Sequence, residues 1–337
     1  MKVLVTGGAG FVGSNLARQL VREGYDVRII DNLARAGSEH NLAWLQSEIP
    51  QLDFIRGDLR DMAAVTRAVT GCDAIFNLAA QVAVTTSVTD PRLDFEVNLL
   101  GTFNVLEAVR AAGRKIPVLF SSTNKVYGKM SAVPICERNG RYEYEAMRDG
   151  VSEETPLDFY SPYGCSKGGA DQYIHDYGRI FGIPTVVFRM SCIYGIRQMG
   201  NEDQGWVAHF LIQAAKGNPV TIYGDGKQSR DVLWVGDLVS LYIASLRAID
   251  TVDGQIFNVG GGPANTICLH DLIAIIREDF GVTLEVSYGD WRPGDQLVYV
   301  SDIAKAKRIL GWEPRTDVRR GLGLLYDWIQ GNLGLFA

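Results

Sequence analysis

The sequence predicts a doubly wound α/β fold, with a parallel sheet and a smaller C-terminal α/β lobe. Short apolar, β-branched runs alternate with helical segments through the first half of the chain, and this alternation is typical of βαβ units. The runs are almost continuously apolar, as expected of strands covered by helices on both faces. A Gly-rich turn follows the first run. The length of 337 residues fits about two domains.

The elements expected in the first domain follow from these patterns. Its strands are expected at residues 2–6, 27–31, 52–56, 74–78, 118–121 and 185–188, with long helices at 93–112 and 162–181. After residue 189, Gly-rich turns separate shorter elements, with helices expected at 205–216, 269–280 and 318–330. The helix 236–248 and the strand 255–259 are expected to return to the first sheet. The predicted domains are therefore 1–188 with 233–259, and 189–232 with 260–337.

Composition excludes several classes of protein. The chain carries 33 basic and 39 acidic residues, a net charge of −6, so no nucleic-acid partner is expected. Five scattered cysteines without a CxxC pair indicate neither a disulfide framework nor a zinc site. The chain shows no signal-peptide pattern and no apolar run of ~20 residues, so we expect a cytoplasmic protein without a membrane partner. No metal is expected, because the histidines lack ligand spacing; they are His40, His175, His209 and His270.

A dinucleotide site is predicted at the first turn. Gly7, Gly10 and Gly13 have the spacing GxxGxxG between a strand and a helix, which suits a tight turn, close approach of a pyrophosphate and close helix packing. Asp31 ends the second strand, where a carboxylate accepts from ribose hydroxyls and repels a 2′-phosphate. This favours NAD over NADP, although Arg35 weakens the preference. Asp58 follows the third strand and either reaches the adenine or caps a helix.

A second motif, YxxxK, carries the predicted chemistry. Tyr163 and Lys167 are four residues apart in a helical segment, so both side chains lie on one helical face. A phenol with a pKa of ~10 becomes a usable base when a nearby cation stabilises the phenolate. The segment SSTNKVYG (121–128) follows a predicted strand and supports a functional role for the pair.

Together, TGGAGFVG (6–13), Asp31, NLAA (77–80), NLLGT (98–102), SSTNKVYG and YGCSK (163–167) resemble the extended short-chain dehydrogenases/reductases. The similarity covers nearly the whole chain, including GDGKQSRD (224–231) and RPGD (292–295). The resemblance implies a Rossmann-type fold, an NAD cofactor and assistance to Tyr163 and Lys167 from Thr123. The further cofactor-binding residues expected are Phe11, Val12, Asn32, Leu59, Leu78, Ala79, Ala80, Asn98, Ser121 and Met190.

The resemblance also helps to choose the reaction. Nucleotide-sugar 4,6-dehydratases of the family carry an Asp-Glu pair where this chain has Asn124 and Lys125, so dehydration is not expected. The segments STNKVYG, LDFYSPYGCSKGGADQY (157–173) and DQGWV (203–207) are similar to those of CDP-sugar 2-epimerases, which act on CDP-paratose. The implied reaction is transient oxidation of C2 to a ketone, followed by return of the hydride.

Substrate contacts are expected from both lobes. The resemblance places Arg230 and Arg292 on the diphosphate, where guanidinium groups match phosphate oxygens; surface ion pairing is the alternative. Tyr223 either stacks on the base or belongs to the core. Gln81 and Thr85 offer polar groups near the sugar, or simply cap a loop. The remaining expected substrate contacts are Thr123, Asn124, Tyr299 and Cys192, the last at a position where the family often has Asn.

Three other functions are compatible with these motifs. A UDP-sugar 4-epimerase uses the same Tyr, Lys and NAD, and a reductase releases NAD(P)H after each turnover. A noncatalytic dinucleotide sensor is disfavoured because Thr123, Tyr163 and Lys167 are all present. The resemblance implies a homodimer or homotetramer formed through the helices at 93–112 and 162–181. Residues 129–161 form a long insertion without periodicity, which predicts a functional or disordered loop.

Overall fold

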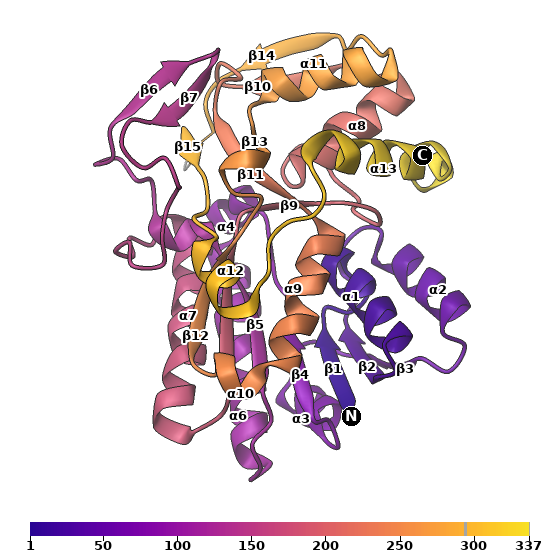
Figure 1. Cartoon of the computed structure of the whole chain (residues 1–337). Coiled ribbons are helices and arrows are strands. Elements are labelled where there is room, and N and C mark those ends of the chain that lie inside the picture. Colours follow the sequence, from indigo (N-terminus) through magenta and orange to yellow (C-terminus); the bar gives the residue numbers. More distant parts are fainter. Residues whose placement is uncertain (293–294, 337) are drawn as a thin grey trace. The chain divides into compact units, whose positions relative to one another are not determined.

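The computed structural model describes residues 1–292 and 295–336, which form two compact units (Figure 1). Unit 1 consists of Met1–Val126, Phe159–Arg189 and Val239–Phe257. Unit 2 consists of Tyr127–Asp158, Met190–Leu238 and the residues from Asn258 onward. The insertion after Tyr127 therefore groups with unit 2. Pro293 and Gly294 of the predicted turn at 292–295 lie outside the described residues.

Unit 1 is built on a seven-stranded sheet with the order β12-β8-β5-β4-β1-β2-β3, which confirms the predicted doubly wound class. The pairings of β1 with β2 and β4, of β2 with β3 and of β4 with β5 are parallel. Strands are added on one side of β1 as far as β3, and later strands are added on its other side, beginning with β4. Ligands of such sheets bind where the order of strands reverses, here between β1 and β4. The strands are β1 (Lys2–Thr6), β2 (Asp26–Asp31), β3 (Asp53–Arg56), β4 (Ala74–Asn77), β5 (Val118–Thr123), β8 (Thr185–Met190) and β12 (Gln255–Val259).

Helices cover both faces of this sheet. Ile75 of β4 belongs to a buried cluster with side chains of α3, α6 and α7. The next residue, Phe76, points to the opposite face, and its ring centroid lies 5.6 Å from that of Tyr242 in α9. This alternation explains why the strands are apolar at consecutive positions. The helices are α1 (Phe11–Arg22), α2 (Ser38–Glu48), α3 (Met62–Val69), α4 (Val84–Thr89), α5 (Pro91–Phe95), α6 (Gly101–Ala111), α7 (Ser161–Phe181), α9 (Val235–Arg247) and α10 (Ile249–Val252).

The predicted single helix at 93–112 is wrong in one respect. The structure divides this segment into α5, a π-helical stretch at Glu96–Leu100 and α6. A π-helical turn widens the helix locally and often occurs at functional sites. The spacing of apolar residues did not indicate the π-helical stretch, because one widened turn rotates the buried face of the helix by only part of a turn.

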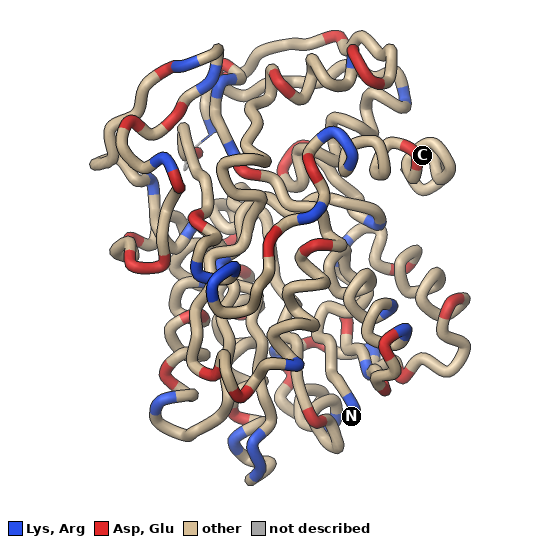
Figure 2. The backbone as a smooth tube through the Cα atoms, viewed as in Figure 1, with Lys and Arg blue, Asp and Glu red and all other residues tan. Residues whose placement is uncertain are grey.

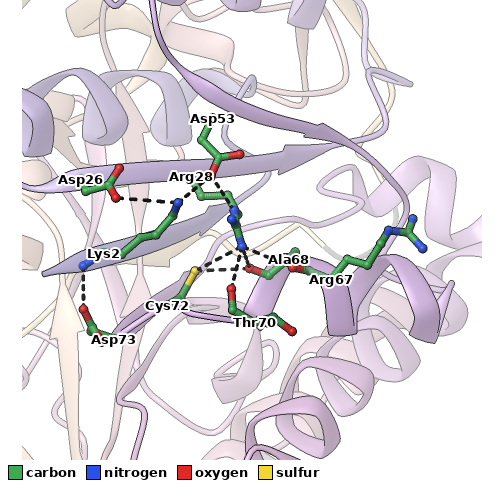
Figure 3. A network of polar contacts seen from close by, with 9 residues as sticks. All are labelled: Lys2, Asp26, Arg28, Asp53, Arg67, Ala68, Thr70, Cys72 and Asp73. Atoms are coloured by element: carbon green, nitrogen blue, oxygen red, sulfur yellow. Dashed lines mark hydrogen bonds and ion pairs between the residues drawn. The ribbon is translucent and has the colours of Figure 1, made fainter.

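Arg28 joins the sheet of unit 1 to the end of α3 (Figure 3). Its Nε donates to Asp53 at 2.8 Å, and its Nη1 donates to the carbonyl oxygens of Ala68 and Thr70 at 3.0 and 2.8 Å. Carbonyl groups at a helix C-terminus lack partners within the helix. Arg28 therefore satisfies the end of α3 while its charge is paired with a carboxylate of the neighbouring strand.

Unit 2 contains several small sheets packed against three main helices. In one sheet β11 pairs with β9, β13 and β15, in another β10 pairs with β14, and β6 pairs with β7. A buried cluster joins α8, α11 and α13 to β10 and β11. The strands are β6 (Ile135–Arg138), β7 (Arg141–Tyr144), β9 (Cys192–Tyr194), β10 (Val220–Tyr223), β11 (Ser229–Trp234), β13 (Thr266–Ile267), β14 (Val286–Gly289) and β15 (Val298–Tyr299). The helices are α8 (Trp206–Lys216), α11 (Leu269–Phe280), α12 (Ala304–Leu310) and α13 (Val318–Gln330).

Within the insertion, the structure has a β-hairpin where the sequence predicts an irregular loop. β6 and β7 are joined by Asn139 and Gly140, both of which have positive φ angles, 50° and 78°. An Asn-Gly pair with this geometry matches the right-handed twist of the strands it connects. The hairpin is anchored within unit 2, because the side chain of Tyr142 donates to Asp225 at 2.6 Å.

Basic and acidic residues are interspersed along the backbone of both units (Figure 2). No helix within residues 1–292 and 295–336 is both long and apolar enough to span a membrane. The same described ranges contain no group of three or more His, Cys, Asp or Glu side chains arranged to hold a metal ion.

Candidate active site

The turn between β1 and α1 requires glycine at two of the three predicted positions. Gly7 has a φ of +65°, and a Cβ there would lie 2.8 Å from the Cα of Ala79. A Cβ on Gly13 would lie 2.1 Å from the carbonyl oxygen of Gly7, so any side chain would push α1 away from the turn. Gly10 is the N-cap of α1 and provides no side-chain cap. The first N–H groups of α1 thus form a site that favours an anion.

Asp31 ends β2 and holds the Gly-rich turn in place. Its carboxylate accepts from the N–H of Ala9 at 3.0 Å and from the N–H of Leu33 at 2.8 Å. Burial raises the pKa of Asp31, and these backbone hydrogen bonds oppose the rise. The side chain remains partly exposed at the carboxyl end of its strand, where the sequence predicts the ribose contact. Arg35 lies in the exposed segment that follows.

Asp58 follows β3 and is paired with Arg60. Two guanidinium nitrogens of Arg60 donate to the carboxylate oxygens at 3.0 and 2.9 Å, and the amide of Asn32 donates at 2.8 Å. Hydrogen bonding to Arg60 is the main reason why the pKa of Asp58 falls to about 2. The alternative in which Asp58 caps a helix is wrong, because Asp61 is the N-cap of α3 and accepts from the N–H of Ala63.

A buried hydroxyl, which the sequence analysis missed, connects the ends of β1 and β4. The Oγ1 of Thr6 accepts from the N–H groups of Leu78 and Ala79 at 3.0 and 3.1 Å, and donates to Asn77 at 2.8 Å. Asn77 in turn donates to Thr102 at 3.2 Å. The sequence signal for this contact was the polar residue that ends each of the two apolar strands.

The other predicted cofactor positions are Phe11 and Val12 in the first turn of α1, Leu59 buried after β3, Ala80 after β4, and Met190 at the end of β8.

Tyr163 and Thr123, which the resemblance links, lie together in unit 1. Thr123 is the last residue of β5, and Tyr163 lies in the first turn of α7, after Pro162. The side chains of Tyr163 and Thr123 are hydrogen-bonded. Burial raises the pKa of Tyr163 to about 12, and this hydrogen bond opposes the rise. Asn124 is next to the pair, and its Oδ1 accepts from the Thr123 hydroxyl at 3.4 Å.

Lys167 lies one turn further along α7, and its ammonium group is buried. Its Nζ donates to the carbonyl oxygen of Ser121 at 2.5 Å and lies 4.2 Å from the centroid of the Phe120 ring. Burial lowers the pKa of Lys167 to about 7, and the negative charges of Asp171 and Asp94 oppose the decrease. Tyr163 thus shares a hydrogen bond with Thr123, and Lys167 lies one turn further along the same helix. Once the phenol is ionised, its oxygen can accept a proton.

A buried ion pair between Asp171 and Arg189 was also missed by the sequence analysis. Asp171 on α7 is fully buried and accepts from Nε and Nη2 of Arg189, both at 3.0 Å. The hydroxyl of Ser122 donates to the same carboxylate at 2.7 Å. A bidentate pair of this kind needs every polar group satisfied in order to be stable when buried. Asp171 follows Lys167 by four residues, and that spacing was the available signal.

Gln81, in the segment after β4, and Asn98, in the π-helical stretch, donate hydrogen bonds to the buried carboxylate of Asp94. The Nε2 of Gln81 donates to Asp94 at 2.8 Å, and its Oε1 accepts from the N–H of Ala83 at 2.6 Å. Asn98 also donates to Asp94, at 3.0 Å. The Gln81 side chain is therefore occupied within the loop. Thr85 keeps a buried hydroxyl that has no hydrogen-bond partner among the described residues.

Arg292 and Tyr223 come together in unit 2. The guanidinium carbon of Arg292 lies 3.9 Å from the centroid of the Tyr223 ring, and its Nη1 donates to the carbonyl oxygen of Glu202 at 2.7 Å. The Tyr223 hydroxyl donates to the carboxylate of Glu202 at 2.6 Å. These contacts hold an aromatic ring and a cation side by side at a partly exposed position.

Arg230 and Tyr299 occupy more buried positions in unit 2. Arg230 donates to Asp295 at 3.1 Å and to the carbonyl oxygen of Gln296 at 2.5 Å. Tyr299 has no exposed surface, and its ring stacks on that of Tyr127. The structure thus places Tyr299 in the core of unit 2, next to the strand that carries Arg230.

Cys192 begins β9 and contacts an indole. The Nε1 of Trp206 donates to the sulfur of Cys192 at 3.5 Å.

Burial lowers the pKa of His209, which shares a helical face with Trp206 in α8. His270 lies elsewhere, with its Nε2 2.8 Å from the carbonyl oxygen of Asp225.

Comparison with known proteins gives consistent matches over nearly the whole chain. A family model described as GDP-mannose 4,6 dehydratase matches residues 4–324. The CDP-paratose 2-epimerase of Salmonella typhi is 44% identical over 335 residues, covering 97% of this chain and 99% of that protein. The structure of the Thermotoga maritima UDP-glucose 4-epimerase with UDP-glucose has a TM-score of 0.85 at 31% identity, covering 99% of this chain and 100% of that one.

A second solved structure is similarly close. The Thermus thermophilus UDP-glucose 4-epimerase, in complex with NAD, has a TM-score of 0.83 at 34% identity and covers 98% of this chain and 100% of that one. These matches cover residues of both units, and the family model spans the positions of every motif on which the resemblance was based. The chain therefore belongs to the extended short-chain dehydrogenases/reductases, in the family described as GDP-mannose 4,6 dehydratase.

Proposed function

We propose that this chain is an NAD-dependent nucleotide-sugar epimerase, an isomerase that inverts C2 of a CDP-sugar in a conversion of the CDP-paratose to CDP-tyvelose type. The observation that carries the proposal is the hydrogen bond between Tyr163 and Thr123, with the buried Lys167 one turn further along α7. The 44% identity to the CDP-paratose 2-epimerase of Salmonella typhi supports the choice of carbon and of base.

The residues at the ends of β1 and β2 fit NAD. The turn at Gly7 and Gly13 has no room for a Cβ, and α1 begins without a side-chain cap, so a diphosphate can approach its N–H groups closely. Asp31 presents a carboxylate that suits ribose hydroxyls and disfavours a 2′-phosphate. The similar Thermus thermophilus enzyme was solved with NAD. When bound, NAD supplies an acceptor, and later a donor, of hydride.

In the proposed mechanism, Tyr163 is the base. Its phenolate takes the proton of the C2 hydroxyl while Thr123 hydrogen-bonds to the same oxygen, and the Lys167 ammonium stabilises the phenolate. Loss of the C2 hydrogen as hydride leaves a 2-keto sugar. After the ketone turns about its bond to the diphosphate, hydride returns to the other face of C2. Tyr163 then gives its proton back to the oxygen, so the reaction is redox-neutral overall.

Turning of the ketone requires that the nucleotide stays anchored while the sugar is loosely held. We assign Arg292 to the diphosphate and Tyr223 to the base, because the two side chains are already in contact. Arg230 is assigned to the diphosphate as well. Its hydrogen bonds to Asp295 and Gln296 hold the guanidinium group in one orientation, which reduces the entropy lost on binding.

A UDP-sugar 4-epimerase is the second candidate. The Thermotoga maritima neighbour, with a TM-score of 0.85, is described as a UDP-glucose 4-epimerase and was solved with UDP-glucose. That activity uses the same base and the same hydride chemistry at C4, so the orientation of the sugar separates the two reactions. Dehydration is disfavoured despite the description of the family model, because Asn124 and Lys125 stand in place of a carboxylate pair.

The function is tested by proton NMR of the purified chain in D₂O, without added cofactor, with CDP-paratose, CDP-glucose and the matching UDP-sugars. Inversion at C2 of a CDP-sugar without deuterium at C2 is the expected result. Inversion at C4 of a UDP-sugar assigns the 4-epimerase instead. Turnover only after addition of NAD(P)H assigns a reductase, and deuterium at C2 contradicts direct return of the hydride.

We further propose that the chain forms a cytoplasmic homodimer or homotetramer through α5–α6 and α7. Apolar side chains on these elements are exposed in unit 1, among them Phe95, Tyr173, Ile180 and Phe181. Exposed apolar patches of this kind commonly mark protein–protein contacts. Analytical ultracentrifugation tests the oligomer, with Ile180→Glu expected to shift the chain toward the monomer.

A further inference from the structure

We propose that Glu202 selects the base of the nucleotide: its carboxylate, held beside the Tyr223 ring, accepts a hydrogen bond from the exocyclic amino group of cytosine and disfavours the oxygen that uracil carries at that position. The inference deepens the proposed function and rests on its assignment of Tyr223 to the base. The motifs that led to that function do not include Glu202, and the mechanism above does not use it.

Glu202 lies at the tip of a tight turn. The backbone groups of Asn201 and Gln204 bond to each other in both directions, at 3.0 and 3.2 Å, so Glu202 and Asp203 are the two central residues. The Oδ1 of Asn201 accepts from the N–H groups of Asp203 and Gln204 at 3.1 and 2.9 Å. An Asn side chain at the first position stabilises a turn in this way. The turn therefore holds its two acidic residues in a defined place.

The turn is fixed to the neighbouring elements of unit 2. A Cβ at Gly200, just before the turn, would lie 2.7 Å from the backbone nitrogen of His209 in α8, so the chain packs directly against the start of that helix. The Tyr223 hydroxyl donates to Oε1 of Glu202 at 2.6 Å, and Arg292 donates to the carbonyl oxygen of Glu202 at 2.7 Å. Glu202 is thus bonded to both residues that we assign to the nucleotide.

The carboxylate of Glu202 can accept further hydrogen bonds. The guanidinium group of Arg292 bonds to the backbone of Glu202 and lies 3.7 Å from the carboxylate of Asp203. The Tyr223 hydroxyl is a neutral donor. A carboxylate has about four acceptor positions, of which this hydroxyl fills one, and Glu202 is exposed. A negatively charged acceptor therefore lies next to the hydroxyl end of the Tyr223 ring.

This acceptor distinguishes between pyrimidines. A base that stacks on Tyr223 has its edge beside the hydroxyl end of the ring, where Glu202 lies. Cytosine has an amino group at C4, and Glu carboxylates accept from this group in nucleic-acid recognition. Uracil has a carbonyl oxygen at C4, which would place two acceptors together. Uracil could offer its N3–H only by sliding within its plane, and its O4 would remain close to the carboxylate. The arrangement thus favours CDP over UDP.

The test is calorimetric titration of the NAD-loaded full chain with CDP, UDP and GDP. Wild type should bind CDP about tenfold or more tightly than UDP. Glu202→Gln should bind the two almost equally, because an amide can accept from the amino group or donate to the uracil oxygen. A role of Glu202 only in holding the turn predicts equal weakening of both. The matched control is Asp203→Asn, which removes the same charge from the other central residue and should change both affinities by the same factor.

The proposal is overturned by a wild-type ratio of CDP to UDP affinity in Glu202→Gln, or by tighter binding of UDP or GDP than of CDP to the wild-type chain. A second measurement needs no variant. The CDP analogue with a 2-pyrimidinone base has a hydrogen in place of the amino group, and wild type should bind it less tightly than CDP and more tightly than UDP. Equal affinity for the analogue and CDP would also overturn the proposal.

These outcomes separate the role of Glu202 from the proposed function. The ligands carry no second sugar, so the result does not depend on which carbon of the substrate reacts. A wild-type preference for UDP or GDP would overturn the choice of base in the proposed function as well. A wild-type preference for CDP that persists in Glu202→Gln would overturn the role of Glu202 alone.

Discussion

The ammonium nitrogen of Lys167 lies 2.5 Å from the carbonyl oxygen of Ser121, two residues before Thr123 in the same strand. One strand end therefore provides both the anchor of the cation and the hydroxyl that bonds to Tyr163. Because Tyr163 and Lys167 are four residues apart in α7, the hydrogen bond to the strand also fixes the position of the phenol. The geometry of the base is thus set by the packing of one strand against one helix.

Replacing Tyr163 by Phe tests this assignment of the base. The variant loses the phenol hydroxyl but keeps the ring, so epimerisation should fall by about 10²–10⁴-fold while NAD remains bound. Rates are measured by NMR, and bound NAD is measured by chromatography after denaturation. Tyr160→Phe, at an exposed tyrosine just before α7, should retain wild-type rates. Retained activity in Tyr163→Phe would remove its role as base.

Replacing Lys167 by Met tests the cost of burying its charge. Burial lowers the pKa of Lys167 to about 7, whereas an unperturbed lysine has a pKa of about 10.4. Between these values the unfolded chain binds more protons than the folded chain, so wild-type stability rises with pH. The stability of the Met variant relative to wild type should therefore be highest at and below pH ~7. It should then decline by on the order of 2–4 kcal/mol toward pH ~10.

Urea unfolding at several pH values measures this difference. The matched control is Lys115→Met, which removes an exposed ammonium group in unit 1 and so separates the effect of losing a surface charge from the effect of burial. A pH-independent difference for Lys167→Met would mean that the lysine keeps its ordinary titration when buried.

Much of the fold was predictable because local patterns determine it. The helices α11 and α13 and the strand β12 have the predicted bounds, since each has clear apolar periodicity between turn residues. The hairpin at Asn139 and Gly140 was also predictable, because an Asn-Gly pair is a strong turn signal. It was missed because β6 (ICER) lacks the alternation expected of a half-buried strand, although β7 (RYEY) alternates polar and aromatic residues.

The site was predictable only where a motif marks it. Tyr163, Lys167 and the turn glycines carry short, spaced signatures. By contrast, Asp94 meets Gln81, and Asp171 meets Arg189, across 13 and 18 residues. Tertiary packing determines which side chains become such partners. The spacing of residues in the sequence does not indicate which donor a buried carboxylate will contact.

Replacing Gly13 by Ala should impair cofactor binding before it impairs folding. The added Cβ would lie 2.1 Å from the Gly7 carbonyl oxygen, so α1 must shift away from the turn, at a cost of about 1–3 kcal/mol. NAD affinity, measured by fluorescence titration, should fall at least tenfold. Gly323→Ala lies within α13, where nothing is within 4 Å of the added Cβ. It should stabilise the chain by about 0.5–1 kcal/mol. Wild-type NAD affinity in Gly13→Ala would contradict the proposed binding site.

Breaking the buried pair of Asp171 and Arg189 should be costly. Asp171→Asn leaves a buried guanidinium without its countercharge, which typically costs about 3–5 kcal/mol. The double variant Asp171→Leu, Arg189→Met should recover much of this stability. On the same helix, Asp176 forms an exposed pair with Arg179 at 2.7 Å, so Asp176→Asn should cost less than about 1 kcal/mol. Urea unfolding measures all three variants, and equal losses for the two Asn variants would contradict the importance of burial.

Replacing Tyr142 by Phe tests whether the inserted hairpin supports nucleotide binding. Tyr142 donates from its hydroxyl to Asp225 at 2.6 Å and from its N–H to the carbonyl oxygen of Lys227 at 3.0 Å. These two residues lie in the loop between Tyr223 and Arg230, the proposed base and diphosphate contacts. Loss of the side-chain hydrogen bond costs about 1 kcal/mol and leaves the loop freer, so more entropy is lost when it orders around the nucleotide.

CDP affinity of the NAD-loaded Tyr142→Phe variant, measured by calorimetry, should therefore fall about fivefold, with KM raised and kcat nearly unchanged. Tyr288→Phe is the matched control, because Tyr288 is an exposed tyrosine of β14 in the same unit, and its CDP affinity should stay at the wild-type value. A decrease in kcat at constant CDP affinity would place the hairpin's effect on the chemical step. An unchanged variant would show that the backbone contact to Lys227 is sufficient to hold the loop.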